Sequence, residues 1–187
     1  MGLDITAISE LESLVLPDNI VLHSDEYWDW EQEQAGPVYS MWQHPGTTGY
    51  LDGLQEGLVV VHGETYGFRA GSYSGYGEWR DDLAKASNYG SANNIWQDPE
   101  SVRGRPFVEL INFSDADGVI GPVMSEKLYM DFVEQEENIM KKVDEWYLKF
   151  DPEKEYDGDT VKWFRQKYSD WKQAFNVARN NGAVIFH

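Results

Sequence analysis

The chain has 187 residues, a formal net charge of −18 at pH 7 and no cysteine. Its 27 aromatic residues (8 Trp, 11 Tyr and 8 Phe) exclude an acidic tail without a core, and the length suits one domain. The lack of cysteine excludes disulfides, thiolate zinc sites and a cysteine nucleophile. No apolar run approaches the roughly 20 residues of a membrane helix, and the first residues lack a secretory signal. We therefore expect a soluble, cytoplasmic protein.

The charge is concentrated at the start of the chain. Residues 1–68 hold twelve Asp or Glu and no Lys or Arg, whereas residues 69–187 hold 21 acidic and 15 basic residues. The formal charge is thus −12 in the first segment and −6 (21 against 15) in the second. Solubility or salt adaptation would also lower the pI, so both stay open beside a functional acidic surface.

The first half of the chain predicts short strands separated by turns. A helical turn is expected at residues 9–14, where leucines are three apart and Pro17 follows. An acidic and aromatic stretch then leads into a loop rich in Gly and Pro that extends to Gly53. The strands are predicted at residues 3–8, 19–23, 58–62 and 65–69.

The second half predicts mainly helices. Residues 87–105 are polar and rich in turn formers, which indicates an exposed excursion. Apolar side chains three and four apart predict two long C-terminal helices, followed by a helix stop at residues 180–182. The expected elements are helices at 78–86, 125–149 and 159–178 and strands at 107–113 and 183–186. We predict a single α+β domain over residues 1–187, with a small mixed or mostly antiparallel sheet and the two long helices packed on one face.

Two segments that link a predicted strand to a predicted helix are candidate ligand loops. In the first, residues 68–76, glycines allow close backbone approach and hydroxyls offer donors beside a helix N-terminus, as an anion site requires. The loop matches neither the P-loop nor the G-x-G-x-x-G pattern, and a tyrosine-rich turn packed over the core is the other interpretation. The residues expected to hold an anion are Arg69, Ser72, Tyr73, Ser74 and Arg80.

The second candidate loop is residues 113–122, with the sequence FSDADGVIGP. Asp115 and Asp117 would direct two carboxylates toward a ribose or a cation, although the register excludes an EF-hand. Asp side chains also stabilise turns by accepting from nearby backbone N–H groups, which is the competing interpretation. We expect no bound metal and no cofactor.

The opening MGLDI, the loop at residues 68–76 and the FSDADGVIGP segment resemble a group of uncharacterised bacterial and phage proteins. Members of that group begin with MGLDI and later carry an FSD-x-acidic-G-x-IGP-like segment. The resemblance is compatible with a phage or mobile-element origin and implies no activity.

No catalytic motif is complete. His23, His44, His62 and His187 are scattered without metal-ligand spacing, and no G-x-S-x-G elbow is present. The carboxylates are numerous, but their spacing selects no acid–base pair. The sequence names no catalytic residue and favours a protein that is not an enzyme, without deciding the matter.

The primary hypothesis is a non-catalytic acidic protein that masks a basic surface of a partner protein. Carboxylates would face Lys and Arg, with aromatic side chains as anchors. If the partner normally binds nucleic acid, the acidic surface would compete with phosphate, as an inhibitor used in phage counter-defence would. The expected partner-binding residues are Asp25, Glu26, Tyr27, Trp28, Asp29, Trp30 and Glu31.

The alternative hypothesis is a protein that binds a small anionic ligand, such as a nucleotide, where residues 68–80 and 113–122 meet. Binding to nucleic acid directly is not expected, because the overall charge repels phosphate. A membrane partner is not expected either, and the sequence does not indicate an oligomeric state.

Overall fold

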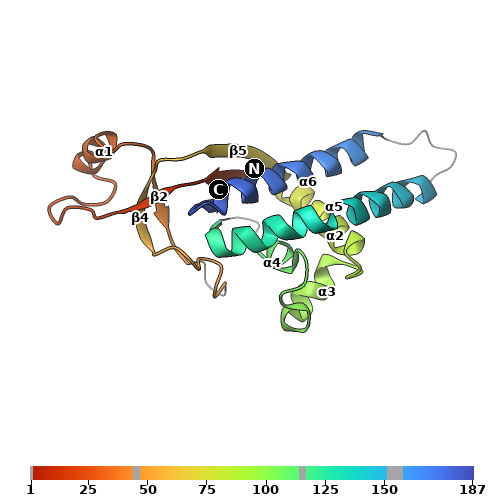
Figure 1. Cartoon of the computed structure of the whole chain (residues 1–187). Coiled ribbons are helices and arrows are strands. Elements are labelled where there is room, and N and C mark those ends of the chain that lie inside the picture. Colours follow the sequence, from red (N-terminus) through yellow and green to blue (C-terminus); the bar gives the residue numbers. More distant parts are fainter. Residues whose placement is uncertain (1, 44–46, 114–116, 151–157) are drawn as a thin grey trace.

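The computed structural model describes residues 2–43, 47–113, 117–150 and 158–187. It confirms the predicted α+β class, with two antiparallel sheets and a pair of long helices (Figure 1). Both chain ends lie near the centre of the molecule, whereas helix α1 and the far ends of the two long helices lie at opposite extremities (Figure 1).

The larger sheet joins the two ends of the chain. Its strand order is β5-β1-β7-β6, and all neighbours are antiparallel. The predicted strands at 3–8, 65–69 and 183–186 are confirmed, whereas β6 lies within the predicted loop at residues 113–122. The strands are β1 (Gly2–Ile8), β5 (Thr65–Ser72), β6 (Gly118–Ile120) and β7 (Ala183–Phe186).

Helices cover one face of this sheet, as predicted. Leu3, Ile5 and Ala7 alternate along β1 and all point into the core formed with the helices. The two long helices are α5 (Pro122–Phe150) and α6 (Gly158–Ala178). The apolar side chains spaced three and four apart along α6 are all buried, namely Val161, Phe164, Tyr168, Trp171, Phe175 and Ala178.

A smaller sheet covers part of the other face. Its strand order is β2-β4-β3, again antiparallel, and only β4 was predicted. Ile8 and Ile185 of the larger sheet share a second apolar cluster with Val59 and Val61 of β4. The strands are β2 (Leu11–Leu14), β3 (Val38–Met41) and β4 (Gly57–Val61).

Two predictions in the first half are wrong. Residues 9–14 form no helical turn. Glu10 takes a left-handed conformation (φ 54°), and the chain continues from β1 into Leu11–Leu14, which pair with β4. Residues 19–23 form no strand. The N–H of Ile20 donates to the Pro17 carbonyl (2.9 Å), so the chain turns there instead of extending beside another strand.

The middle of the chain is more helical than predicted. Helix α2 (Tyr73–Ala86) begins five residues before its predicted start, and the excursion at 87–105 contains α3 (Ala92–Gln97) and a 3₁₀ helix, η1 (Pro99–Val102). The predicted strand at 107–113 is wrong, because α4 (Val108–Ile111) occupies it. Phe107 is left-handed (φ 63°), and its N–H donates to the Asp131 carboxylate on α5 (2.9 Å), which turns the chain into a helix.

Candidate functional site

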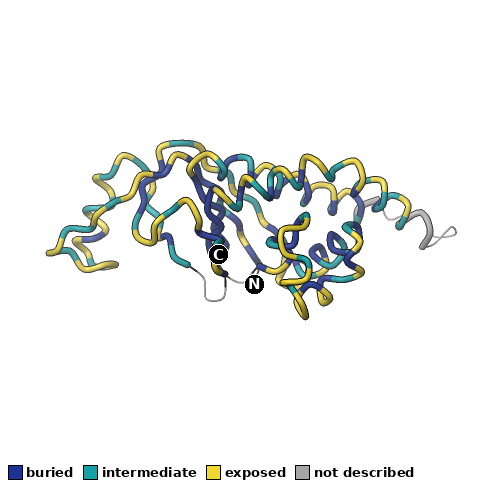
Figure 2. The backbone as a smooth tube through the Cα atoms, turned by 60° about the horizontal axis from the view of Figure 1, so that its bottom comes forward, coloured by how far each residue is buried: buried dark blue, intermediate teal, exposed yellow. Residues whose placement is uncertain are grey.

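The acidic stretch forms a separate projection, which we call the arm and define as residues 15–37, between β2 and β3. It carries helix α1 (Asp25–Gln32), which lies at one end of the molecule (Figure 1). Tyr27 is its single buried residue, and the rest of its backbone belongs to exposed or half-buried residues (Figure 2). Helix α1 makes few contacts with any other helix or strand. The predicted partner-binding residues therefore lie together on an element that stands apart from the core.

Local signals explain why α1 begins where it does. The Ser24 hydroxyl caps the helix by accepting from the N–H of Tyr27 (3.2 Å). Asp25 and Glu26 follow in the first turn, where the partial positive charge of the helix end favours carboxylates. Hydrogen bonding by its own backbone N–H and by Ser24 lowers the pKa of the fully exposed Glu26. The N-terminal end of α1 is thus well satisfied by its own acidic residues.

Aromatic rings hold the arm together from within. Tyr27 is buried (4 % exposed), and its ring centroid lies 5.0 Å from that of Trp28, 5.6 Å from that of His23 and 5.8 Å from that of Trp30. Burial and the neighbouring Glu31 carboxylate raise the pKa of Tyr27. Trp28 stays 46 % exposed. Tyr27 therefore has a packing role within the arm, and Trp28 is the aromatic residue presented to solvent.

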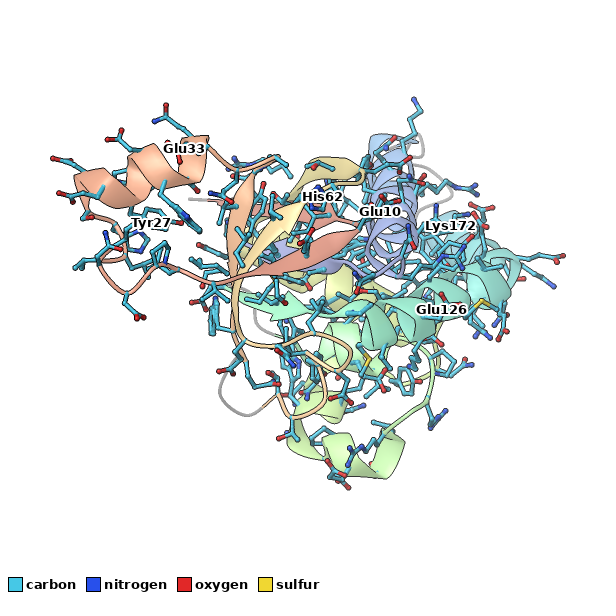
Figure 3. All side chains as sticks on the ribbon, turned by 60° about the vertical axis from the view of Figure 1, so that its left-hand side comes forward. Glu10, Tyr27, Glu33, His62, Glu126 and Lys172 are labelled. Carbon is cyan, nitrogen blue, oxygen red and sulfur yellow. The ribbon has the colours of Figure 1, made fainter. Side chains whose placement is uncertain are left out.

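The carboxylates of the arm have no Lys or Arg neighbour among the side chains that the structure describes. Of the described Lys and Arg side chains, none lies within ion-pair distance of the arm's six carboxylates. The helical body, by which we mean helices α2 to α6, differs. There Lys172 pairs with Glu136 (2.8 Å) and Arg165 with Asp144 (2.7 Å). Tyr27 and Glu33 on α1 lie on the opposite side of the molecule from Glu126 and Lys172 (Figure 3). The acidic residues of the arm are Asp18, Asp25, Glu26, Asp29, Glu31 and Glu33.

The C-terminal end of α1 is capped by a neutral group and not by a cation, because the Gln34 side-chain amide donates to the Trp30 carbonyl (2.7 Å). Its last turn has no basic residue, and Glu33 is the C-terminal cap with Glu31 just before it. A helix C-terminus carries partial negative charge, so carboxylates there are unfavourable and a cation would be favourable. A positive group from outside the chain would interact favourably with the partial negative charge of the helix end and with both carboxylates.

Arg80 of the alternative site lies in the core. It is 4 % exposed, and its guanidinium donates to the Phe113 carbonyl (2.7 Å) and stacks over the Tyr76 ring (4.5 Å). It also lies over the Trp96 ring at 5.3 Å. Arg80 thus joins α2 to the segment after α4, and its charge is directed to backbone carbonyls inside the protein.

The other candidate residues of the first loop lie at the junction of β5 and α2. Ser72 caps α2 by accepting from the Gly75 N–H (3.0 Å), and its hydroxyl lies 3.1 Å from that of Ser74. Tyr73 opens the helix and is partly exposed. Arg69 is exposed on β5 and pairs with Asp4 (3.7 Å). The start of α2 is therefore capped by its own side chains.

The second loop is only partly described. Asp115 lies outside the described residues, and Asp117 is exposed just before β6. Strands β1 and β7 separate β6 from β5, so Ser72 and Asp117 belong to opposite edges of the sheet. With neighbouring strands about 4.8 Å apart, three spacings place these edges about 14 Å from each other. Arg80 links the helices behind the two loops but does not bring the candidate ligand groups together.

Sequence reasoning missed a charged cluster between α4 and α5. The ammonium of Lys127 contacts Glu109 and lies 2.8 Å from the Asp131 carboxylate, which also receives the N–H of the left-handed Phe107. Burial raises the pKa of Asp131, partly opposed by its bond to Lys127. No sequence spacing links Glu109 to Asp131, since the contact needs the docking of α4 on α5. The cluster holds these helices together.

Sequence reasoning also missed an apolar groove of about 410 Å³ beside the arm. It lies where the start of the arm passes the small sheet, and it is lined by Leu14, Val15, Leu16, Leu22, Ser40, Gly57 and Leu58. Residues 14–22 are rich in apolar side chains, but this composition is compatible with a strand or a turn and does not indicate a groove.

The described part of the chain offers few other candidate functional groups. His62 pairs with Glu12 (2.9 Å) at the surface. Among the residues that the structure describes, no three His, Asp or Glu side chains group as metal ligands would. Within the same residues, no helix combines the length and apolar character required to cross a membrane.

Comparison with protein-family models, with curated proteins and with solved structures gives no match for this chain.

Proposed function

We propose that this chain is a non-catalytic acidic binding protein whose arm masks a basic surface of a partner protein in the cytoplasm. The observation that carries the proposal is the arm itself, with six carboxylates, no cation and an exposed tryptophan on an element held away from the core. Trp28 would insert among the side chains of the partner while Asp25, Glu26, Asp29 and Glu31 face Lys or Arg. A basic surface that ordinarily binds nucleic acid is the kind of target we infer, which suits an inhibitor of phage or mobile-element type.

The electrostatics of α1 support a basic protein as partner. Its C-terminal end has a partial negative charge beside Glu31 and Glu33 and no basic residue in its last turn. A lysine or arginine from a partner would be favourable at that end, whereas a phosphate would be repelled. The geometry thus favours competition with nucleic acid over binding to it.

No observation favours the small-ligand alternative over this proposal. Of its two expected cationic groups, the Arg80 guanidinium is buried and directed to the carbonyls of Ile111 and Phe113, which leaves Arg69, an exposed residue paired with Asp4 (3.7 Å). The start of α2 is capped by Ser72. A thermal-shift panel of nucleotides checks the alternative, and we expect no shift.

The test is retention of a partner from host-type lysate, followed by a salt gradient. The arm variant replaces Asp25, Glu26, Asp29 and Glu31 with Lys, which changes the formal charge from −18 to −10, two units for each of four residues. The wild type is expected to retain a basic protein that salt releases, and the arm variant is expected to lose it.

The control variant makes the same change in charge on the helical body. It replaces four exposed glutamates outside the arm with Lys, namely Glu78, Glu134, Glu137 and Glu145. Both variants have the same net charge of −10. If the control variant retains the partner and the arm variant loses it, the binding lies in the arm. Equal retention by both variants, each with a wild-type circular dichroism spectrum, would contradict the proposal.

A further inference from the structure

The apolar groove beside the arm is built from three neighbouring strands and the start of the arm. Leu14 of β2, Leu58 of β4 and Ser40 of β3 are direct cross-strand partners, so they lie in one row on the same face of the small sheet. This is the face opposite to the core, because Val59 and Val61 on the alternate positions are buried against the larger sheet. Val15, Leu16 and Leu22 from the arm also line the groove.

The groove leaves apolar side chains open to solvent. Val15 is 88 % exposed and Leu22 is 44 % exposed, and Val21 beside them is also exposed. A volume of about 410 Å³ falls within the about 300–1,000 Å³ of binding pockets. Isolated apolar side chains on a surface are common, but a shared groove lined by them indicates a contact site.

Acidic residues flank the groove along the chain on every side. Glu12 precedes Leu14 by two residues on the same face of β2, and Asp18 follows Leu16 by two. Asp25 follows Leu22 by three residues, and Glu56 adjoins Gly57. Every residue that lines the groove belongs to residues 1–68, which contain no Lys or Arg. A second copy of this chain would bring an equally acidic surface to the same place, so charge opposes self-association here.

We propose that this groove binds the apolar side chains of a basic, amphipathic segment of the partner protein. The inference rests on the proposed function, because it assigns to the partner of the arm one chemical character: Lys or Arg on one side of a segment and Leu, Ile or Val on the other. The carboxylates of the arm meet the charges, and the groove takes the apolar side chains. Attraction between the charges speeds the association of the segment, and the apolar contact gives it a higher affinity than other basic segments have.

The probes are two labelled peptides with the same number of lysines at the same positions. On the face opposite to the lysines, one peptide carries leucine and the other carries serine. With the full chain, we expect the leucine peptide to bind about tenfold more tightly than the serine peptide in fluorescence anisotropy, which is about 1.4 kcal/mol.

The groove variant is Val15→Asn combined with Leu22→Asn, at two exposed positions. It is expected to abolish the preference for leucine and to leave binding of the serine peptide unchanged. The control variant is Val123→Asn combined with Val133→Asn, two exposed valines on α5, and it is expected to keep the preference.

The outcomes separate this inference from the proposed function. Equal, salt-sensitive binding of both peptides would overturn the groove and leave the acidic arm standing. Binding of neither peptide would contradict the proposed function itself. Dimerisation of the wild type that disappears in the groove variant would assign the groove to a second copy of this chain and overturn the inference.

Discussion

The arm and the helical body differ in how their carboxylates are paired. On α5 and α6 and just after α6, carboxylates meet cations within the chain, as in the pairs of Lys172 with Glu136 and Arg179 with Glu126. In the arm, six carboxylates meet no described cation. Most aromatic side chains of the body are buried or half-buried, although Trp96 on α3 is 45 % exposed, and Trp28 of the arm is 46 % exposed.

This difference separates residues that maintain the fold from residues available to a partner. Exposed ion pairs contribute little free energy, so the pairs of the body mainly keep its acidic surface neutral. The arm has neither internal neutralisation nor a large core, and an eight-residue helix is marginal without outside contacts. Its composition is costly for folding alone, and the proposed function gives that composition a role in binding.

Two tryptophans give the largest expected contrast. Trp171 is fully buried, with its ring centroid 5.7 Å from that of Phe175 and 6.0 Å from that of Trp79. Trp171→Ala is expected to lower the free energy of unfolding by about 4 kcal/mol. Trp28→Ala is expected to lower it by less than about 1 kcal/mol while weakening partner binding. Urea denaturation measures both, and equal losses would contradict the comparison.

Lys127→Met tests the charged cluster of the body. It leaves the Glu109 and Asp131 carboxylates together without their cation, so we expect a loss of about 3 kcal/mol near neutral pH. Burial already raises the pKa of Asp131 above its unfolded value, and loss of the lysine raises it further. The folded state therefore binds the proton more tightly, and stability is lost as the pH rises through that pKa.

The loss caused by Lys127→Met should consequently be smaller near pH 4 than near pH 7. Urea denaturation of the variant and the wild type at both pH values checks the sign. Lys141→Met, at an exposed position of the same helix, is the control and is expected to have little effect at either pH. A loss for Lys127→Met that does not depend on pH would show that the carboxylates are not its cause.

Two serine caps test whether the arm folds separately. Ser24→Ala and Ser72→Ala each remove one helix cap, worth about 1 kcal/mol. Since α2 is part of the core, Ser72→Ala should lower the global stability. Ser24→Ala should instead speed amide hydrogen exchange only within α1, by about fivefold, without changing the unfolding midpoint. An equal change of midpoint in both variants would show that the arm is coupled to the body.

The smallest expected effect is that of Glu33→Lys, which should stabilise α1 and weaken partner binding. Glu33→Lys places a cation at the C-terminal end of α1, which should stabilise that helix by about 0.5 kcal/mol and slow its amide exchange. The same change should weaken binding to a basic partner. Glu33→Gln is the control and should have intermediate effects on both. Faster exchange in Glu33→Lys would contradict the electrostatic description of α1.

Local patterns predicted the elements whose packing repeats along the sequence. The buried stripe of α6 and the last strand were readable because Phe164, Tyr168, Trp171 and Phe175 recur at helical spacing before a Gly stop. Distant contacts decide the elements that the sequence misassigned. Leu11–Leu14 becomes a strand because Leu58–Val61 pairs with it, and the chain at Phe107 turns into a helix because Asp131 accepts its N–H.

The candidate site divides in the same way. The acidic and aromatic residues 25–31 were recognisable because they are contiguous in the chain. Their separation from the core, the burial of Tyr27 and the exposure of Trp28 needed the structure. The groove was not predictable, since it combines Leu14, Leu22 and Leu58 from two strands and the arm. Arg80 was misleading for a related reason, because its contacts with the carbonyls of Ile111 and Phe113 are distant in sequence.

The most direct test of the central claim is the salt dependence of affinity for the retained partner, measured for the wild type, the arm variant and the control variant. If the arm binds a basic surface, the wild-type Kd should rise at least about tenfold between about 0.05 and 0.5 M NaCl, because screening acts on exposed charges. The control variant should keep that dependence, and the arm variant should bind weakly with a much shallower one. A salt dependence that is the same in all three proteins would contradict the claim that the carboxylates of the arm form the binding surface.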